Sequence, residues 1–378
     1  MNIQRHFTEQ EKALQSQVSE FVDREVRPHI AQWYETATLP VELLPKMADL
    51  GLFGMHLKGY GCPGRSAVEY GIAMQELEAG DSGLRTVISV QGSLAMTAIH
   101  RHGSEEQKNY WLPRMARGEA IGCFGLTEPN AGSDPANMKT TATQESDGWH
   151  LTGAKRWIGL ASIADVAIIW AKVDGTVRGF VVPTDTPGFK ATPIEQKLSM
   201  RASLQCDIEL DVHLPDSAIL PDNPGLKGPF TCLNEARYGI AWGALGAARD
   251  SIEVALDYAA NREVFDRPLS SFQLTQKKLV DMVVELNKAQ LLALELGRAK
   301  DAGQLELHQI SVAKLANCRT AIEICRDART ILGGNGITGD YSPLRHANNL
   351  ESVRTYEGTD EVHTLIVGNK LTGHAAFR

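Results

Sequence analysis

A glutamate near the end of the chain has a setting in which a carboxylate could act as a base. Glu357 lies between Tyr356 and Gly358. An aromatic ring on one side and a glycine on the other could desolvate the carboxylate. Desolvation raises the pKa of a carboxyl group toward that of a useful general base. From spacing alone, however, an exposed glutamate at a helix end is the better interpretation.

Two segments in the middle of the chain have the composition of binding loops. Residues 126–134 (LTEPNAGSD) bunch turn-forming and small polar residues, which is typical of a surface loop. Their amides and hydroxyls could also bind a ring edge or a phosphate. Residues 153–159 (GAKRWIG) place Trp157 close to glycines, where its ring could either join the core or flank a planar cofactor.

Residues 334–339 (GNGITG) match the G-x-G-x-x-G pattern of dinucleotide-binding loops. That pattern carries its meaning only where it follows a strand and opens a helix. Here it follows a helical run over 310–332. The segment is therefore expected to form the C-terminal cap and turn of that helix.

Composition restricts the class of protein. The 378 residues carry a net charge of −8, which argues against nucleic acid as a partner. The six cysteines form no C-x-x-C pair and no zinc-type cluster, so we expect reduced thiols and no metal site. No apolar stretch is long enough to span a membrane. The first residues do not resemble a signal peptide and the last (HAAFR) match no retention address, which predicts a cytoplasmic location.

The hydrophobic period changes twice along the chain. Helical spacing at the start, with Thr8 and Ser104 as N-caps, predicts a helical domain over 1–118. Strict alternation over 204–214 and shorter apolar runs predict an antiparallel sheet or small barrel over 119–226. Long amphipathic helices return afterwards and predict a helical bundle over 227–378.

Five motifs taken together resemble the acyl-CoA dehydrogenase family over essentially the whole chain. They are residues 126–134, 155–158 (KRWI), 262–265 (REVF), 332–336 (LGGNG) and 356–359 (YEGT). The resemblance implies an α+β fold that is mostly α. It has an N-terminal helical domain, a middle β-barrel-like domain and a C-terminal four-helix bundle. It also implies FAD as cofactor, an acyl-CoA substrate and a homotetramer.

By the same resemblance, Glu357 is the base that removes the α-proton of the thioester while the β-hydrogen leaves as hydride to the flavin. The positions that would contact the flavin or thioester are Leu126, Thr127, Ser133, Trp157, Ile158 and Gly159. Those that would reach the FAD of a neighbouring subunit are Arg262, Phe265, Gln273, Gly333 and Gly334. Thr359 and Glu361 match positions near the adenosine half of FAD, and Asn234 and Arg237 match positions that line the CoA channel.

Residues 76–91 and 232–243 resemble the glutaryl-CoA dehydrogenases in particular. In those enzymes the arginine at the position of Arg85 pairs with the distal carboxylate of the substrate. The residues matching Glu78, Thr86 and Tyr356 lie around it. A guanidinium at the bottom of an acyl pocket binds a carboxylate in bidentate fashion and selects against plain fatty chains. An isolated arginine would instead be expected at the surface.

Two positions depart from the glutaryl-type pattern. Gly159 stands where those enzymes have threonine, and Thr86 stands where they have serine. Some related acyl-CoA oxidases have glycine at the position of Gly159, where an opened space beside the flavin could admit oxygen. The alternative function is therefore an acyl-CoA oxidase, or a flavoenzyme for another short or acidic acyl chain. Electron-transfer flavoprotein is the expected electron acceptor, and decarboxylation of the product is left open.

Overall fold

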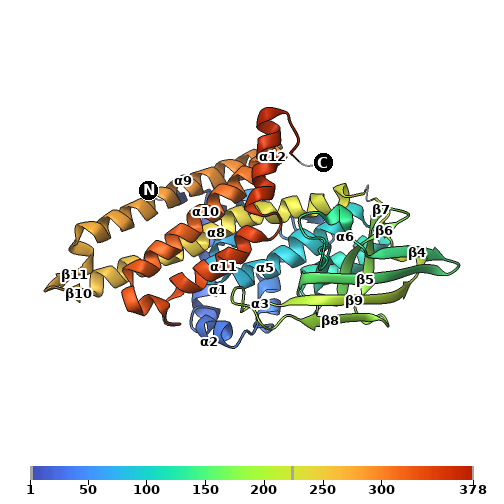
Figure 1. The fold of residues 1–378 in the computed structure, drawn as a ribbon, viewed down its shortest axis with the longest axis horizontal. Helices are drawn as coiled ribbons and strands as arrows, with labels where there is room; N and C mark the ends of the chain where they lie inside the picture. Colours follow the sequence, from blue (N-terminus) through green and yellow to red (C-terminus); the bar gives the residue numbers. More distant parts are fainter. Residues whose placement is uncertain (1–2, 223–224, 377–378) are drawn as a thin grey trace.

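The computed structural model describes residues 3–222 and 225–376. The remaining positions (1–2, 223–224 and 377–378) lie outside it, so parts of the two end segments used to predict location are not described. Figure 1 shows long helices side by side along the molecule, with a curled sheet at one end. The predicted order of helical, β and helical regions is confirmed.

The N-terminal region is helical apart from one short hairpin. Thr8 and Ser104 cap their helices as predicted, each within a reciprocal capping box. The helices are α1 (Glu9–Glu25), α2 (Ile30–Glu35), α3 (Leu43–Asp49), α4 (Ala67–Gly80), α5 (Ser82–Ile88), α6 (Thr97–His102) and α7 (Glu105–Ala116). A 3-10 turn (Ile3–His6), a π-helix (Ser89–Met96) and the hairpin β1 (Lys58–Gly59) and β2 (Cys62–Pro63) complete the region.

The middle region is one seven-stranded sheet. Its strands follow the order β3-β6-β4-β5-β9-β8, and β7 pairs with β6. Pairing is antiparallel except that β6 runs parallel to β3 and β4. The strands are β3 (Gly122–Gly125), β4 (Thr141–Glu145), β5 (Gly148–Gly159), β6 (Val166–Val173), β7 (Thr176–Pro183), β8 (Phe189–Pro193) and β9 (Gln205–Leu214). Short 3-10 turns cover Pro135–Asn137 and Asp216–Ala218.

Strand β6 joins the sheet to the helices. Ile168 and Trp170 belong to the hydrophobic core shared by the two helical regions, whereas Ala167 and Ile169 belong to the core of the sheet. Because both faces of β6 are buried, its sequence is continuously apolar instead of alternating. Strand β9 has one wet face, and its alternation follows from that.

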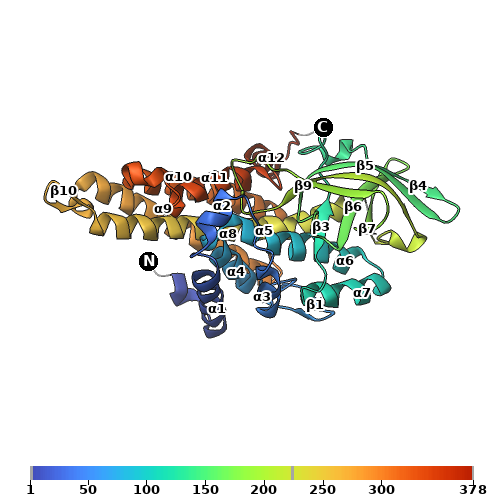
Figure 2. The same cartoon turned by 90° about the horizontal axis from the view of Figure 1, so that it is seen from below.

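The C-terminal region is a bundle of four helices with a fifth across it (Figures 1 and 2). The four are α8 (Lys227–Asn261), α9 (Gln273–Asp301), α10 (Leu307–Ile331) and α11 (Ser342–Thr355), and the crossing helix is α12 (Asp360–Thr372). The hairpin β10 (Glu263–Val264) and β11 (Arg267–Pro268) and 3-10 turns at Leu269–Ser271 and Gly333–Ile337 close one end of the bundle. The predicted domain boundaries fall between α7 and β3 and directly before α8, and they stay predictions.

The glycine-rich segment after α10 also has the predicted form. Gly333 follows α10 with a φ of +60°, so residues 333–337 form a helix end and turn, as predicted for this glycine-rich segment. All six cysteines are free thiols. Over residues 3–222 and 225–376, no helix is long and apolar enough to cross a membrane, and no cluster of His, Cys, Asp and Glu is arranged to hold a metal.

Candidate active site

An arginine is completely buried where α4, α5 and the α11–α12 loop meet. Arg85 has no exposed side-chain surface, and its Nε donates to Glu78 Oε2 at 2.7 Å. Its Nη2 donates to the Tyr356 hydroxyl. Among the described residues, no group accepts a hydrogen bond from Nη1. Because buried donors are normally paired, this nitrogen is a ready site for an acceptor supplied by a ligand.

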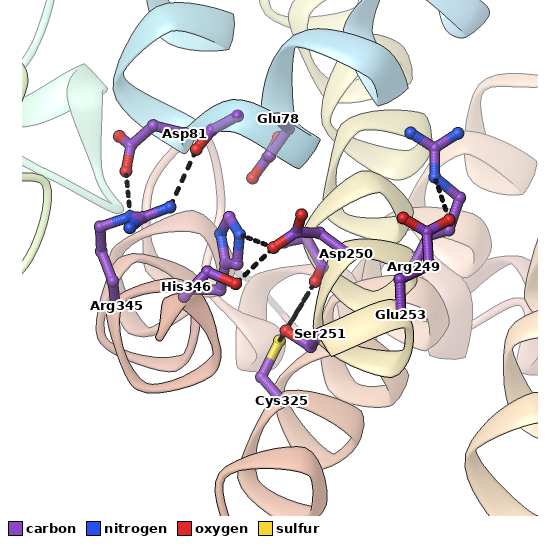
Figure 3. Close-up of polar contacts among 12 residues, drawn as sticks. Glu78, Asp81, Arg249, Asp250, Ser251, Glu253, Cys325, Arg345 and His346 are labelled. Atoms are coloured by element: carbon purple, nitrogen blue, oxygen red, sulfur yellow. Dashed lines mark hydrogen bonds and ion pairs between the residues drawn. The ribbon is translucent and has the colours of Figure 1, made fainter. Parts of the chain in front are cut away.

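The position of Arg85 is fixed by the start of its helix. Asp81 caps α5, because its Oδ1 accepts from the Gly83 amide at 2.7 Å. Its Oδ2 accepts from Arg345 Nε at 3.2 Å (Figure 3) and from Asn349 Nδ2 at 2.9 Å. Both partners belong to α11, so the helix that carries Arg85 is tied to the helix that leads into residue 356.

The partner carboxylate is held as firmly as the arginine. Glu78 is fully buried, and its Oε1 accepts from Ser82 Oγ at 2.8 Å while Oε2 accepts from Arg85. Gly243 on α8 provides the room for this pair, since a Cβ there would lie 2.3 Å from Glu78 Oε2. Removing one partner of such a buried pair strands the other charge.

A second buried network holds α11 against α8. Asp250 accepts from His346 Nε2 at 3.0 Å and from the Ser342 hydroxyl (Figure 3). Nearby, Ser251 Oγ contacts Cys325 Sγ of α10 at 3.2 Å. These contacts do not involve Arg85. They fix α11, and the loop after its C-terminal end (residues 356–359) is called the base loop below.

The base loop has an unusual backbone conformation. Glu357 has a φ of +55° and Gly358 a φ of +104°. A left-handed conformation costs a non-glycine residue about 1–3 kcal/mol and persists only where surrounding contacts enforce it. One such contact comes from α8, where Arg237 Nε donates to the Glu357 carbonyl oxygen at 2.7 Å. The turn directs the Glu357 side chain inward, and the expectation of an exposed helix-end glutamate is wrong.

The surroundings of Glu357 give it the properties of a base. Part of its side chain still reaches solvent, but Oε2 is shielded and has no hydrogen-bond partner within the described chain. Burial raises the pKa of Glu357 to about 7, and the positive charges of Arg85, Lys314 and Arg237 oppose the rise. A carboxylate with this pKa is half ionised at neutral pH and is matched to proton abstraction there.

Three residues at this site were not identified from the sequence. Lys314 on α10 is 1% exposed, and its Nζ donates to the Gly358 carbonyl oxygen at 2.8 Å. His363 on α12 is buried against the same glycine. Ser89 is buried four residues after Arg85, and its hydroxyl has no partner among the residues described. The i, i+4 spacing from Arg85 could have indicated Ser89, whereas no local pattern distinguishes the other two.

A buried ion pair attaches the loop that begins at Leu126 to strand β5. Lys155 on β5 is fully buried, and its Nζ donates to Glu128 Oε1 at 2.9 Å and to the Leu126 carbonyl at 3.2 Å. Burial lowers the pKa of Lys155 to about 8, against the opposing charge of Glu128. The Arg156 amide donates to the Thr127 carbonyl at 2.9 Å, so the loop and β5 form one rigid unit.

The ring of Trp157 is displayed on this unit. The pairing of β5 with β9 shifts register between Lys155 and Ile158, and Trp157 within this bulge has a φ of +63°. Ile158 points into the core, whereas the Trp157 side chain is 51% exposed. A large exposed ring on a bulge with positive φ fits a planar cofactor better than it fits the core.

The structure differs from expectation at Gly159. A Cβ at this position would lie 2.9 Å from Val90 Cγ2, in the π-helix that begins at Ser89. Glycine at this position was expected to leave an open space. The Val90 side chain occupies the space where a Cβ of residue 159 would lie. The reason is tertiary packing, which brings the N-terminal helices against the end of β5.

The residues expected to reach a neighbouring subunit lie at the other end of the bundle. All are exposed, and Phe265, with a φ of +51° and 88% exposure, stands out furthest. Helix α11 runs between this end and the base loop, a distance of ~20 Å for its 14 residues. The members of this set are Arg262, Phe265, Gln273, Gly333 and Gly334.

The remaining predicted residues are scattered around the base loop and the loop that begins at Leu126. Thr359 caps α12 through the Val362 amide at 3.3 Å, and Glu361 is exposed in the first turn. Arg237 Nη1 donates to Asn234 Oδ1 at 3.3 Å. The half-buried Thr86 donates to the Ser82 carbonyl, and Ser133 is exposed.

Comparison with known proteins identifies the family. Three domain descriptions match the chain in order: acyl-CoA dehydrogenase N-terminal domain over residues 8–119, middle domain over 123–212 and C-terminal domain over 223–372. The human short-chain specific acyl-CoA dehydrogenase, a mitochondrial protein, is 35% identical over 93% of this chain and 87% of its own length. The chain belongs to the acyl-CoA dehydrogenase family.

Solved structures of the family place the chain more finely. A glutaryl-CoA dehydrogenase from Mycobacterium smegmatis is 60% identical with a TM-score of 0.98, covering 100% of this chain and 98% of that one. A second structure described in the same way, in complex with FADH2, is 57% identical, also with a TM-score of 0.98 and the same coverage. The expected acyl-CoA dehydrogenase fold and the resemblance to glutaryl-CoA dehydrogenases are confirmed.

Proposed function

We propose that this enzyme oxidises a short acyl-CoA that carries a distal carboxylate, of the glutaryl-CoA type, at the bond between its α and β carbons. The observation that carries the proposal is the buried Arg85, whose Nη1 has no partner in the described chain. A plain acyl chain would leave this charged donor unpaired, whereas a substrate carboxylate would satisfy it. The likeness to the mycobacterial glutaryl-CoA dehydrogenases supports the same substrate class.

The two ends of the substrate have separate partners. Arg85, held by Glu78 and Tyr356, binds the distal acid group and fixes the position of the acyl chain. Glu357 removes the proton from the carbon next to the thioester. Tyr356 and Glu357 are neighbours on the base loop, so recognition of the acid group and proton abstraction are coupled through one short turn.

The cofactor is FAD, which supplies the two-electron acceptor for the β-hydrogen. The exposed Trp157 and the loop of Leu126 and Thr127 would hold its ring system. Arg262 and Phe265, at the far end of the bundle, would bind the FAD of a second subunit. The exposed apolar side chains near them on α8 and α9 (Leu256, Leu274, Val280, Val284) support a homotetramer.

Location and electron acceptor are also part of the proposal. A cytoplasmic location is proposed from the sequence, although the human relative is mitochondrial. Electron-transfer flavoprotein is proposed as acceptor. Val90 fills the space beside Gly159, and this packing favours the dehydrogenase over the oxidase.

The direct test is anaerobic reduction of the purified yellow enzyme. Glutaryl-CoA should bleach the flavin absorbance faster than butyryl-CoA, and mass spectrometry of the product should show whether carbon dioxide is lost. Equal or faster bleaching by butyryl-CoA would contradict the substrate proposal. Rapid recolouring on admission of air, without electron-transfer flavoprotein, would favour an oxidase.

A further inference from the structure

Lys314 is a buried charge at this site that the proposed function does not use. It lies in the middle of α10 with 1% exposure, and Gly358 O is its hydrogen-bond partner, at 2.8 Å. An ammonium group has three donors and is strongly hydrated in water. Its burial needs a compensating contact, and the base loop supplies one through the Gly358 carbonyl.

The base loop is held by two cations on successive carbonyl groups. Arg237 of α8 donates to the Glu357 carbonyl at 2.7 Å, and Lys314 of α10 donates to the next carbonyl, that of Gly358. Behind them, His363 Nε2 would lie 2.8 Å from a Cβ at Gly358, so the turn is closed on this side as well. These contacts enforce the left-handed conformation of Glu357, which a non-glycine residue adopts only under constraint.

We infer that Lys314 is a positioning residue for the base: it fixes the base loop through the Gly358 carbonyl and gives the Glu357 carboxylate a buried positive neighbour. The inference rests on the proposed role of Glu357. Lys314 is not a catalytic residue, because its ammonium contacts the loop backbone and acts through Glu357.

The charged groups that face Glu357 come from each surrounding element. Arg85 lies on α5, Arg237 on α8 and Lys314 on α10, and their charges lower the pKa of Glu357, which burial raises.

On α12, burial lowers the pKa of His363 to about 3, so this imidazole is neutral at the working pH. Asp360 on the same helix is paired with Arg319 and Arg354. Glu78 is paired with Arg85. Lys314 is therefore one of three cations, with Arg85 and Arg237, whose positive charge lowers the pKa of Glu357.

The test is the pH dependence of anaerobic flavin reduction in Lys314→Met. Methionine has a similar length but neither charge nor donor. Reduction should slow, and the acid limb of the pH profile should move to higher pH by about one unit, because loss of a nearby cation raises the pKa of a carboxyl group. FAD content, measured by absorbance, should stay at the wild-type level. Lys314→Arg, which keeps charge and donor, should restore the wild-type acid limb.

The matched control is Arg319→Met, which removes a cation from the same helix. Arg319 pairs with Asp360 and does not bond to the base loop, so the acid limb should stay within a few tenths of a pH unit. An unshifted limb in Lys314→Met, or an equal shift in Arg319→Met, would overturn the inference. Glu357→Gln is measured in parallel. If that variant still reduces the flavin, the proposed function fails; if it does not while Lys314→Met behaves as wild type, only the role of Lys314 fails.

Discussion

The acyl end and the cofactor face of this enzyme are built in opposite ways. Around Arg85 the side chains are buried and hydrogen bonds join three helices, α4, α5 and α11. Around Trp157 and Phe265 the rings are exposed and sit on residues with positive φ. The side chains that orient Arg85 all come from the single chain. The other region presents surfaces that a cofactor and a second subunit would complete.

The difference fits what each region is proposed to bind. A substrate must enter and leave at every turnover, so its charged partner has to be oriented in advance, because ordering it anew would cost binding free energy. A cofactor that stays bound can contribute its own surface to the fold and can stabilise the folded state by binding to it. Substitutions at the two ends should therefore fail in different ways.

The largest effect is expected where the chemistry takes place. Glu357→Gln keeps the size of the side chain and removes the proton acceptor, so flavin reduction by substrate should fall by at least ~10²–10⁴-fold. FAD content should be unchanged. In the wild type, reduction should rise with pH through about 7, because only the ionised carboxylate accepts a proton. The rate of flavin reduction is followed by stopped-flow absorbance. A near wild-type rate in the variant would show that Glu357 is not the base.

The next effect separates the substrates. Arg85→Ala should lower kcat/KM for glutaryl-CoA by roughly 30- to several-thousand-fold, which corresponds to the ~2–5 kcal/mol of a truncated buried pair. Butyryl-CoA has no acid group and should be spared. Equal losses on both substrates would mean that Arg85 supports structure only.

The same substitution leaves Glu78 buried without its cation, which can cost ~3–5 kcal/mol of stability. The control is therefore the double variant Glu78→Gln with Arg85→Gln, in which no charge is stranded. Its melting temperature should lie above that of Arg85→Ala, while discrimination between the two substrates stays lost.

A third prediction concerns the exposed end of the bundle. Arg262→Ala should weaken FAD binding by about 10- to 100-fold, the value of one charge-assisted hydrogen bond. It should also loosen the proposed tetramer, as seen by size-exclusion chromatography with absorbance at the flavin wavelength. Arg267→Ala on the same hairpin, where the guanidinium stacks on Phe272 at 4.0 Å, is the matched control and should retain FAD. A monomeric Arg262→Ala protein with full FAD would contradict the idea of a shared site.

The smallest effect is expected at Gly159, the last residue of β5. Gly159→Thr alone should be destabilising, because its Cβ would press on Val90 Cγ2 at 2.9 Å. Combined with Val90→Ala, the threonine should fit, and air reoxidation of the reduced enzyme should slow by no more than several-fold. Melting temperatures that are equal in the single and double variants would show that Val90 moves away without cost.

The sequence by itself determined the elements and the chemistry of individual residues. The N-caps at Thr8 and Ser104, the alternation of β9 and the helix end at Gly333 follow from local patterns and came out as predicted. Together with the family motifs, the pattern also identified Arg85, Tyr356 and Glu357. Their types alone did not, since an isolated arginine or glutamate is expected at the surface.

Only the tertiary structure decided how those residues are held. The positive φ of Glu357, the bond from Lys314 to Gly358 and the packing of Val90 against Gly159 join segments far apart in the chain. The same is true of Asp81, which links α5 to α11 over more than 260 positions. Sequence periodicity reports which face of an element is buried, but it cannot report which side chain of another element meets that face. For that reason Glu357 could be proposed as the base from the sequence, whereas Lys314 could not be proposed to position it.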